Sequence, residues 1–176
     1  TATLSLWLAE HQMNNKFHER LGTHIDALPL RPSGNIFCGN ACRLDWNAVC
    51  PHTADEEVYV MGNPPYLGAR LQEEKHKEDM DFAMGETIAY NNLDYISTWF
   101  YIGAKYIERS NAKLAFVSTN SICQGEQVSI LWKYIYKETN SEIWLGYKAF
   151  KWKNNAKHNA GVSCSIIGLR NKSDFH

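Results

Sequence analysis

The chain has 176 residues and a mass of 20.2 kDa, which suits one globular domain with a sizeable core and is too short for two ordinary domains. Hydrophobic residues make up 44% and charged residues 21%, which excludes a disordered or fibrous chain. The formal net charge is -1, no apolar run is long enough for a membrane span, and residues 1–20 lack the plan of a signal peptide, so we expect a cytoplasmic protein without membrane contact.

Apolar residues at helical spacing predict a helix over residues 1–17 that is buried on two sides. After a loop rich in Pro and Gly, residues 35–38 form a short strand candidate. The β-preferring run 58–61 predicts a buried strand, which ends where two prolines forbid further ladder hydrogen bonds.

Charged residues over 73–84 predict a solvated helix or a mobile loop, and apolar spacing over 93–107 predicts a helix with Asn91 and Asn92 as cap candidates. A strand at 114–117 and a helix at about 125–136 follow. Two further strands, 143–147 and 162–169, should form a closing hairpin. This alternation predicts an α/β sheet that is mostly parallel, with one antiparallel strand at its end.

Charge is distributed unevenly along the chain. Residues 1–146 hold 12 Lys and Arg against 18 Asp and Glu, a net of -6, whereas residues 147–176 hold six basic residues against one acidic residue, a net of +5. A polyanion is therefore expected to bind near the C-terminal end, although a solvated basic loop explains the same numbers equally well. The lysines concerned are Lys148, Lys151, Lys153 and Lys157.

The five cysteines are odd in number, irregularly spaced and without a CxxC pair, so they predict reduced thiols rather than a disulfide framework. The histidines do not stand at zinc-ligand spacing from these cysteines, and no metal site is predicted.

Asn63, Pro64, Pro65 and Tyr66, here called the NPPY loop, follow a predicted strand at the end where α/β sheets bind ligands. The loop suits methylation of a planar amine, whose lone pair is delocalised into a ring. The Asn63 side-chain carbonyl and the Pro64 backbone carbonyl can each accept one amine hydrogen and so direct the lone pair at a methyl donor. The prolines hold both acceptors in place before the substrate arrives.

The Tyr66 ring offers a face on which a base swung out of a duplex can stack. Two other interpretations of the loop stay open at this point. It is a simple turn, or it is an Asn-Pro-x-Tyr peptide of the kind that phosphotyrosine-binding modules recognise, which would make the chain an interaction protein.

Four segments carry a resemblance to a known family: 39–46, 62–68, 150–168 and the string Ala-Phe-Val-Ser-Thr-Asn-Ser-Ile-Cys-Gln-Gly-Glu-Gln at 115–127. They resemble the gamma class of adenine-specific DNA methyltransferases, above all the large single-chain type II (IIG or IIL) restriction-modification enzymes. The resemblance implies a Rossmann-like class I fold, S-adenosylmethionine as cofactor, double-stranded DNA as partner and transfer of a methyl group to the exocyclic amine of a flipped adenine. The nearest enzymatic alternative is methylation of an RNA amine or a protein glutamine.

The resemblance also implies roles for particular residues. The NPPY loop is catalytic, and Phe150, with Trp152 as its substitute, packs with Tyr66 on the flipped adenine. Asn40 and Ala41 contact the adenine of the cofactor, and Asp45 is either a second cofactor contact or a turn cap. For Leu93, Asp94 and Tyr95, packing in the core is favoured over a cofactor contact. The basic residues of 148–157 would flank the flipped base and hold the DNA backbone.

Family members hold the cofactor's methionine end with a Gly-rich loop after the first strand and its ribose with an acidic residue after the second. No two glycines of this chain lie within two positions of each other. We therefore expect residues 1–176 to be the C-terminal portion of a methyltransferase catalytic domain, with the first two strands of the sheet missing. The N-terminal portion, with nuclease and target-recognition domains, would belong to the same polypeptide, and the piece alone should be inactive.

Overall fold

A computed structural model describes residues 2–22, 36–85, 89–151 and 163–172. The chain divides into two units, residues 1–39 and 40–176, and each is described by itself. None of the helices in the described part of the chain combines the length and hydropathy that a bilayer span requires.

The first unit contains α1 (Ala2–Leu21), which ends where Gly22 adopts a φ of 68° and its N–H donates to the His18 carbonyl at 2.8 Å. The predicted helix is therefore confirmed. Its predicted burial on two sides is wrong, because no residue of α1 is buried. The predicted strand at 35–38 is also wrong over its described part, since residues 36–38 form no ladder with another strand; Asn35 lies outside the described residues.

The second unit is built on a four-stranded sheet of β1 (Tyr59–Gly62), β2 (Lys113–Thr119), β3 (Ser141–Lys151) and β4 (Ser163–Asn171) in the order β1-β2-β4-β3. β1 and β2 are parallel, and β4 is antiparallel to both of its neighbours. The closing hairpin and the single reversed strand are confirmed. The reversed strand is not at the edge, however, because β4 inserts between β2 and β3. The strand predicted at 58–61 is confirmed as β1, but its predicted burial is wrong, because Tyr59, Met61 and Gly62 are exposed.

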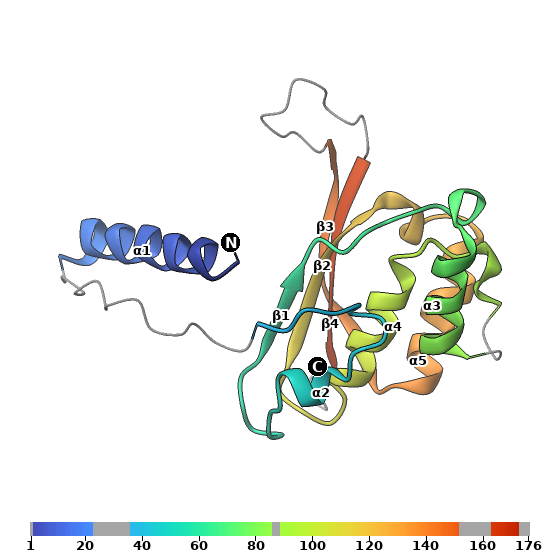
Figure 1. The fold of residues 1–176 in the computed structure, drawn as a ribbon, viewed down its shortest axis with the longest axis horizontal. Helices are drawn as coiled ribbons and strands as arrows, with labels where there is room; N and C mark the ends of the chain where they lie inside the picture. The colour runs from blue at the N-terminus through green and yellow to red at the C-terminus, as the bar shows by residue number, and fades with distance from the viewer. Residues whose placement is uncertain (1, 23–35, 86–88, 152–162, 173–176) are drawn as a thin grey trace. The chain divides into compact units, whose positions relative to one another are not determined.

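The helices α3 (Glu74–Met84), α4 (Ser97–Tyr106) and α5 (Lys133–Glu138) all lie on one side of this sheet (Figure 1). Alternate residues of β2 face them: Leu114 and Phe116 are buried, and the Phe116 ring meets Phe100 of α4 edge-on, with centroids 5.4 Å apart. A π-helical turn, η4 (Val128–Trp132), leads into α5 and carries Trp132, whose ring centroid is 5.5 Å from that of Phe100. This aromatic cluster forms the centre of the core.

The predicted helix over 73–84 is confirmed as α3. The helix predicted over 93–107 begins only at Ser97, because residues 90–92 form the 3-10 turn η2 (Tyr90–Asn92). The prediction that Asn91 and Asn92 cap this helix is wrong. The Asp94 carboxylate instead accepts a hydrogen bond from the Ile96 N–H at 3.3 Å, in front of α4.

Candidate active site at the carboxyl edge of the sheet

The NPPY loop leaves β1 at Gly62, which pairs with Phe116 of β2. Pro64 is buried, Tyr66 is half-buried, and Asn63 and Pro65 are exposed. The loop is thus anchored by Pro64 and Tyr66, whereas the Asn63 side chain is accessible to a ligand. Because each proline fixes its own φ and restricts the residue before it, this local geometry follows from the loop's own sequence.

Three strands bring other residues to the same edge. Cys164, at the start of β4, pairs with Thr119 at the end of β2 and with Phe150 near the end of β3. The Tyr66 hydroxyl lies near the Cys164 thiol, and each affects the pKa of the other. Tyr66 and Phe150 are therefore both neighbours of Cys164, so two aromatic residues predicted to stack on a base lie at one edge of the sheet.

Both groups of this contact stay protonated at neutral pH. Burial, followed by the neighbouring Cys164 and Asp94, raises the pKa of Tyr66 above its ordinary value. Burial likewise raises the pKa of the Cys164 thiol, against a smaller lowering by Tyr66. Tyr66 thus presents a neutral aromatic ring, which suits stacking, and Cys164 is not an activated nucleophile.

The structure describes two of the four lysines that were predicted to contact DNA at this edge. Lys148 and Lys151 are exposed on β3, on either side of Phe150, where a bulge between Tyr147 and Phe150 shifts the register. The Phe150 ring also meets Tyr147 edge-on, with centroids 5.8 Å apart. Trp152, Lys153 and Lys157, which the sequence predicted for base stacking and DNA contact, lie outside the described residues.

The predicted cofactor residues lie in the turn before α2 (Trp46–Val49). The Asn40 amide donates to Asp79 Oδ2 at 2.7 Å, and its carbonyl accepts from the Cys42 N–H at 3.0 Å. The Ala41 carbonyl accepts from the Trp46 indole at 2.8 Å. Asp45 is the N-cap of α2, and its side chain accepts from the Asn47 N–H at 2.9 Å. Of the two roles predicted for Asp45, this contact corresponds to the turn cap.

Asp79 organises this turn and was missed by sequence reasoning. Its carboxylate accepts from Asn40, from Arg43 Nε at 2.5 Å and from the Tyr95 hydroxyl at 2.7 Å. Burial raises the pKa of Asp79, but the hydrogen bonds from Arg43, Tyr95 and Asn40 outweigh it and hold that pKa below its ordinary value. The signal that could have found this residue is Met80 beside it, which marks the buried side of an otherwise charged helix.

Leu93, Asp94 and Tyr95 are all buried, which confirms the preference for core packing. Asp94 does more than fill space, because its carboxylate accepts from the N–H of Leu67, the residue after Tyr66, at 2.9 Å. This contact joins segments 27 positions apart, and no local pattern indicated it.

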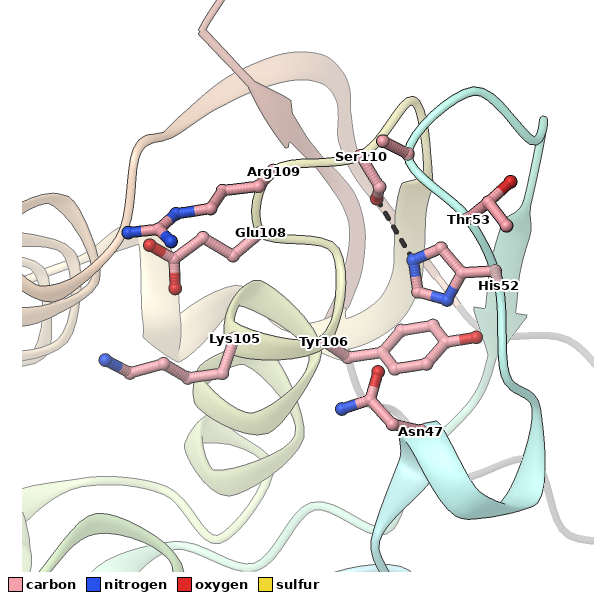
Figure 2. Close-up of a pocket in the computed structure, with 9 residues that line it drawn as sticks. Asn47, His52, Thr53, Lys105, Tyr106, Glu108, Arg109 and Ser110 are labelled. Atoms are coloured by element: carbon pink, nitrogen blue, oxygen red, sulfur yellow. Dashed lines mark hydrogen bonds between the residues drawn. The ribbon is translucent and has the colours of Figure 1, made fainter.

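A cavity of about 430 Å³ lies elsewhere, in front of the amino ends of β1 and β2 (Figure 2). Tyr106 and His52 line one part of it, and the His52 ring is hydrogen-bonded to the Ser110 hydroxyl at 3.1 Å. Lys105, Glu108 and Arg109 extend to the other side of the turn in Figure 2. No predicted site residue lines this cavity, so it is separate from the NPPY loop. All five cysteines are free thiols, and within the described ranges no three His, Cys, Asp or Glu side chains gather as metal ligands.

The family model of the MmeI DNA-methyltransferase domain matches residues 1–176. DNA methyltransferase A of Bacillus subtilis (strain 168) is 53% identical over 169 residues, which cover 96% of this chain and 19% of that protein.

A solved structure of the type IIL restriction-modification enzyme MmeI in complex with DNA matches with a TM-score of 0.79 at 36% identity, over 96% of this chain and 22% of that one. The chain thus spans about a fifth of the length of these relatives. Its mixed α/β fold is that of a class I methyltransferase-like domain, and the chain belongs to the family of MmeI-type DNA-methyltransferase domains.

Proposed function

We propose that this chain carries the catalytic loop of an adenine-specific DNA methyltransferase that transfers a methyl group from S-adenosylmethionine to the exocyclic amine of a flipped adenine. The observation that carries the proposal is the NPPY loop, with an exposed Asn63 beside Tyr66 and Phe150 at the carboxyl edge of the sheet. The family membership supports DNA as substrate, and the solved relative was captured in complex with DNA.

In this proposal, the flipped adenine stacks against Tyr66 and Phe150, which offsets part of the free energy lost on unstacking. The Asn63 side-chain carbonyl and the Pro64 carbonyl accept the two amine hydrogens. They draw the nitrogen towards tetrahedral geometry and free its lone pair for attack. Because both acceptors are held by the loop before substrate binds, little reorganisation is needed during the reaction.

S-adenosylmethionine, when bound, supplies a methyl group activated by its sulfonium charge. The described residues fit its adenine end: Asp79 fixes the orientation of the Asn40 amide, and the Asn40 carbonyl uses one lone pair on Cys42 and keeps the other for an amine hydrogen. The methionine and ribose ends would be held by a segment outside residues 1–176. We therefore propose that these residues are the C-terminal portion of the catalytic domain and that the first two strands of its sheet lie in that segment.

The same reasoning extends to the whole enzyme. We propose that it is a longer cytoplasmic polypeptide with nuclease and target-recognition parts, acting in restriction and modification. The interaction-module alternative is not favoured, because Pro64 is buried and Tyr66 is half-buried, whereas a peptide for a binding module must be exposed.

The test is a methylation assay of the intact enzyme with labelled S-adenosylmethionine and three acceptors: unmethylated phage DNA, total RNA and a protein extract. We expect N6-methyladenine in the DNA by mass spectrometry. Label only in RNA or in protein glutamine would refute the proposal in favour of the corresponding alternative, and the Asn63→Ala enzyme serves as the negative control.

A further inference from the structure

Asp94 is a buried carboxylate that lies directly behind the NPPY loop. It stands between η2 and α4, and 4% of its surface is exposed. Its Oδ1 accepts from the Leu67 N–H at 2.9 Å and from the Ile96 N–H at 3.3 Å. One oxygen thus joins the loop to the start of a core helix.

The other oxygen of Asp94 faces the end of β2. Oδ2 lies 3.4 Å from both the Thr119 and the Ser121 hydroxyl oxygens, and these two hydroxyls are hydrogen-bonded to each other. Because one hydroxyl hydrogen is used between them, the other is available to donate to Oδ2. The Asp94 N–H donates to the Gln127 side-chain carbonyl at 3.1 Å. Asp94 therefore connects the loop after β1 with the loop after β2.

The backbone of Leu67 is held on both sides by this segment. While its N–H donates to Asp94, its carbonyl accepts from the Tyr95 N–H at 3.0 Å and from the Gln72 amide at 2.9 Å. The same Gln72 amide donates to the Leu93 carbonyl at 2.9 Å. Leu67 immediately follows Tyr66, so fixing it limits where the Tyr66 ring and the Pro64 carbonyl can lie.

The donors around Asp94 are all neutral. A buried carboxylate is strongly destabilising unless it is paired or saturated with hydrogen bonds. Asp79, the other buried carboxylate, is paired with Arg43, but among the described residues Asp94 has no salt bridge with Lys or Arg. Its carboxylate instead accepts from two backbone N–H groups and from the hydrogen-bonded hydroxyl pair of Thr119 and Ser121, which come from the loops that flank the proposed site.

We infer that Asp94 is a positioning residue for methyl transfer, which holds the NPPY loop in its reactive position through Leu67 and couples it to residues 119–121. The inference rests on the proposed function. It assigns Asp94 no contact with the substrate, since it acts through the loop.

The test uses the intact enzyme with Asp94→Ala, Asp94→Asn and the control Thr139→Val. Thr139 is also buried and hydrogen-bonded, to the Ile135 carbonyl and the Ser141 hydroxyl, but it lies at the end of α5 and does not touch the loop. Single-turnover methylation of phage DNA is measured at saturating cofactor, together with the cofactor Kd. A loop displaced by about 1 Å lowers such a rate about 100-fold.

For Asp94→Ala we expect a methylation rate about 100-fold below that of wild type and a cofactor Kd within about threefold of wild type. The reason is that a loop shift affects the reacting groups and not the cofactor's adenine contacts. Asp94→Asn keeps one acceptor oxygen and should restore the rate to within about tenfold of wild type. Thr139→Val should lower the unfolding midpoint and leave the rate unchanged. Equal rates for Asp94→Ala and Thr139→Val would overturn the inference.

A second readout does not depend on activity. Hydrogen exchange of the peptide covering residues 64–72 should become at least about tenfold faster in Asp94→Ala than in Thr139→Val, because the Leu67 N–H loses its acceptor. If the wild-type enzyme methylates no DNA, the proposed function fails, yet this measurement still decides whether Asp94 holds the loop. If Asp94→Ala does not fold, Asp94→Ser takes its place, because its shorter side chain does not reach the Leu67 N–H, and a rate and exchange equal to those of Thr139→Val would overturn the inference.

Discussion

Asn63 and Asp79 are polar residues that differ in solvent exposure. Asn63 is exposed on a loop that prolines hold in place, so its carbonyl is available to a substrate. Asp79 is buried and its oxygens are occupied by Asn40, Arg43 and Tyr95. Exposure with a fixed backbone suits a substrate contact, whereas burial with every acceptor engaged suits a structural role.

Asn63→Ala in the intact enzyme should lower the single-turnover rate of DNA methylation about 100-fold or more, because it deletes one preorganised acceptor for the amine. Cofactor affinity should change little, since Asn63 is not among the residues proposed to hold it. Quench-flow methylation and calorimetric titration measure the two quantities. A rate within a fewfold of wild type would remove Asn63 from the mechanism.

Asp79 should make the protein sensitive to acid. Its pKa is lowered in the folded state, so its stabilising effect is present above the unfolded value of about 3.9 and is lost as the pH falls through the lower folded value. The free energy of unfolding is measured by urea titration at a series of pH values from about 5 downwards. It should therefore fall less for Asp79→Asn than for wild type over this range. Asp45→Asn, which removes a charge but keeps a helix cap, is the control and should follow wild type. Parallel curves for all three proteins would contradict this account.

At the scale of elements, the close fit of β4 between its neighbours depends on Gly168. A Cβ at this position would lie 2.9 Å from Leu145 Cβ, 3.0 Å from the Leu114 carbonyl oxygen and 3.0 Å from Trp144 Nε1. The carbonyl belongs to the paired β2 backbone and cannot yield. The absence of a side chain here lets the Trp144 indole donate to the Leu169 carbonyl at 3.1 Å.

Gly168→Ala should lower the free energy of unfolding by about 1–3 kcal/mol through overpacking. Gly146→Ala on β3 is the matched control, because a Cβ there would meet nothing within 4 Å. Urea titration of both variants measures the difference. If the two midpoints coincide, the crowding around Gly168 does not affect stability.

The predicted DNA contact can be tested at the end of β3, where the structure describes two of the four lysines, Lys148 and Lys151. Lys148→Gln with Lys151→Gln should weaken DNA binding and reduce the slope of log K against log salt by about 1.8, since each phosphate contact contributes about 0.9. Lys133→Gln with Lys137→Gln on α5 removes the same charge from another element and should leave the slope unchanged. Fluorescence anisotropy across a salt series makes the comparison. Identical slopes would mean that Lys148 and Lys151 are solvated residues of β3 that do not contact DNA.

At the scale of the whole molecule, the chain spans about a fifth of its relatives, and no two of its glycines stand within two positions of each other. We predict that residues 1–176 alone do not bind S-adenosylmethionine with micromolar affinity, because Asn40 can hold only the adenine end. Calorimetric titration of the isolated chain measures this, with the intact enzyme as positive control. One-to-one micromolar binding would mean that the cofactor site lies within these residues.

The sequence by itself determined the local features of this protein. The β-preferring run before two prolines predicted β1 and its end, though not its exposure, the apolar periodicity predicted the body of α4, and the family strings identified a methyltransferase. These features depend on the conformational preferences of neighbouring residues, which a pattern of a few positions contains. The short strand predicted at 35–38 had no such support from a pairing partner, and over its described residues 36–38 it was wrong.

The tertiary structure alone decided which distant residues meet. The insertion of β4 between β2 and β3 places Cys164 between Thr119 and Phe150, and Tyr66 of the loop after β1 lies near it. The contact of Asp94 with Leu67 spans 27 positions, and that of Asp79 with Asn40 spans 39. Such contacts depend on strand order and register, and a shift of one residue would turn every side chain to the other face, so the local patterns could not specify them.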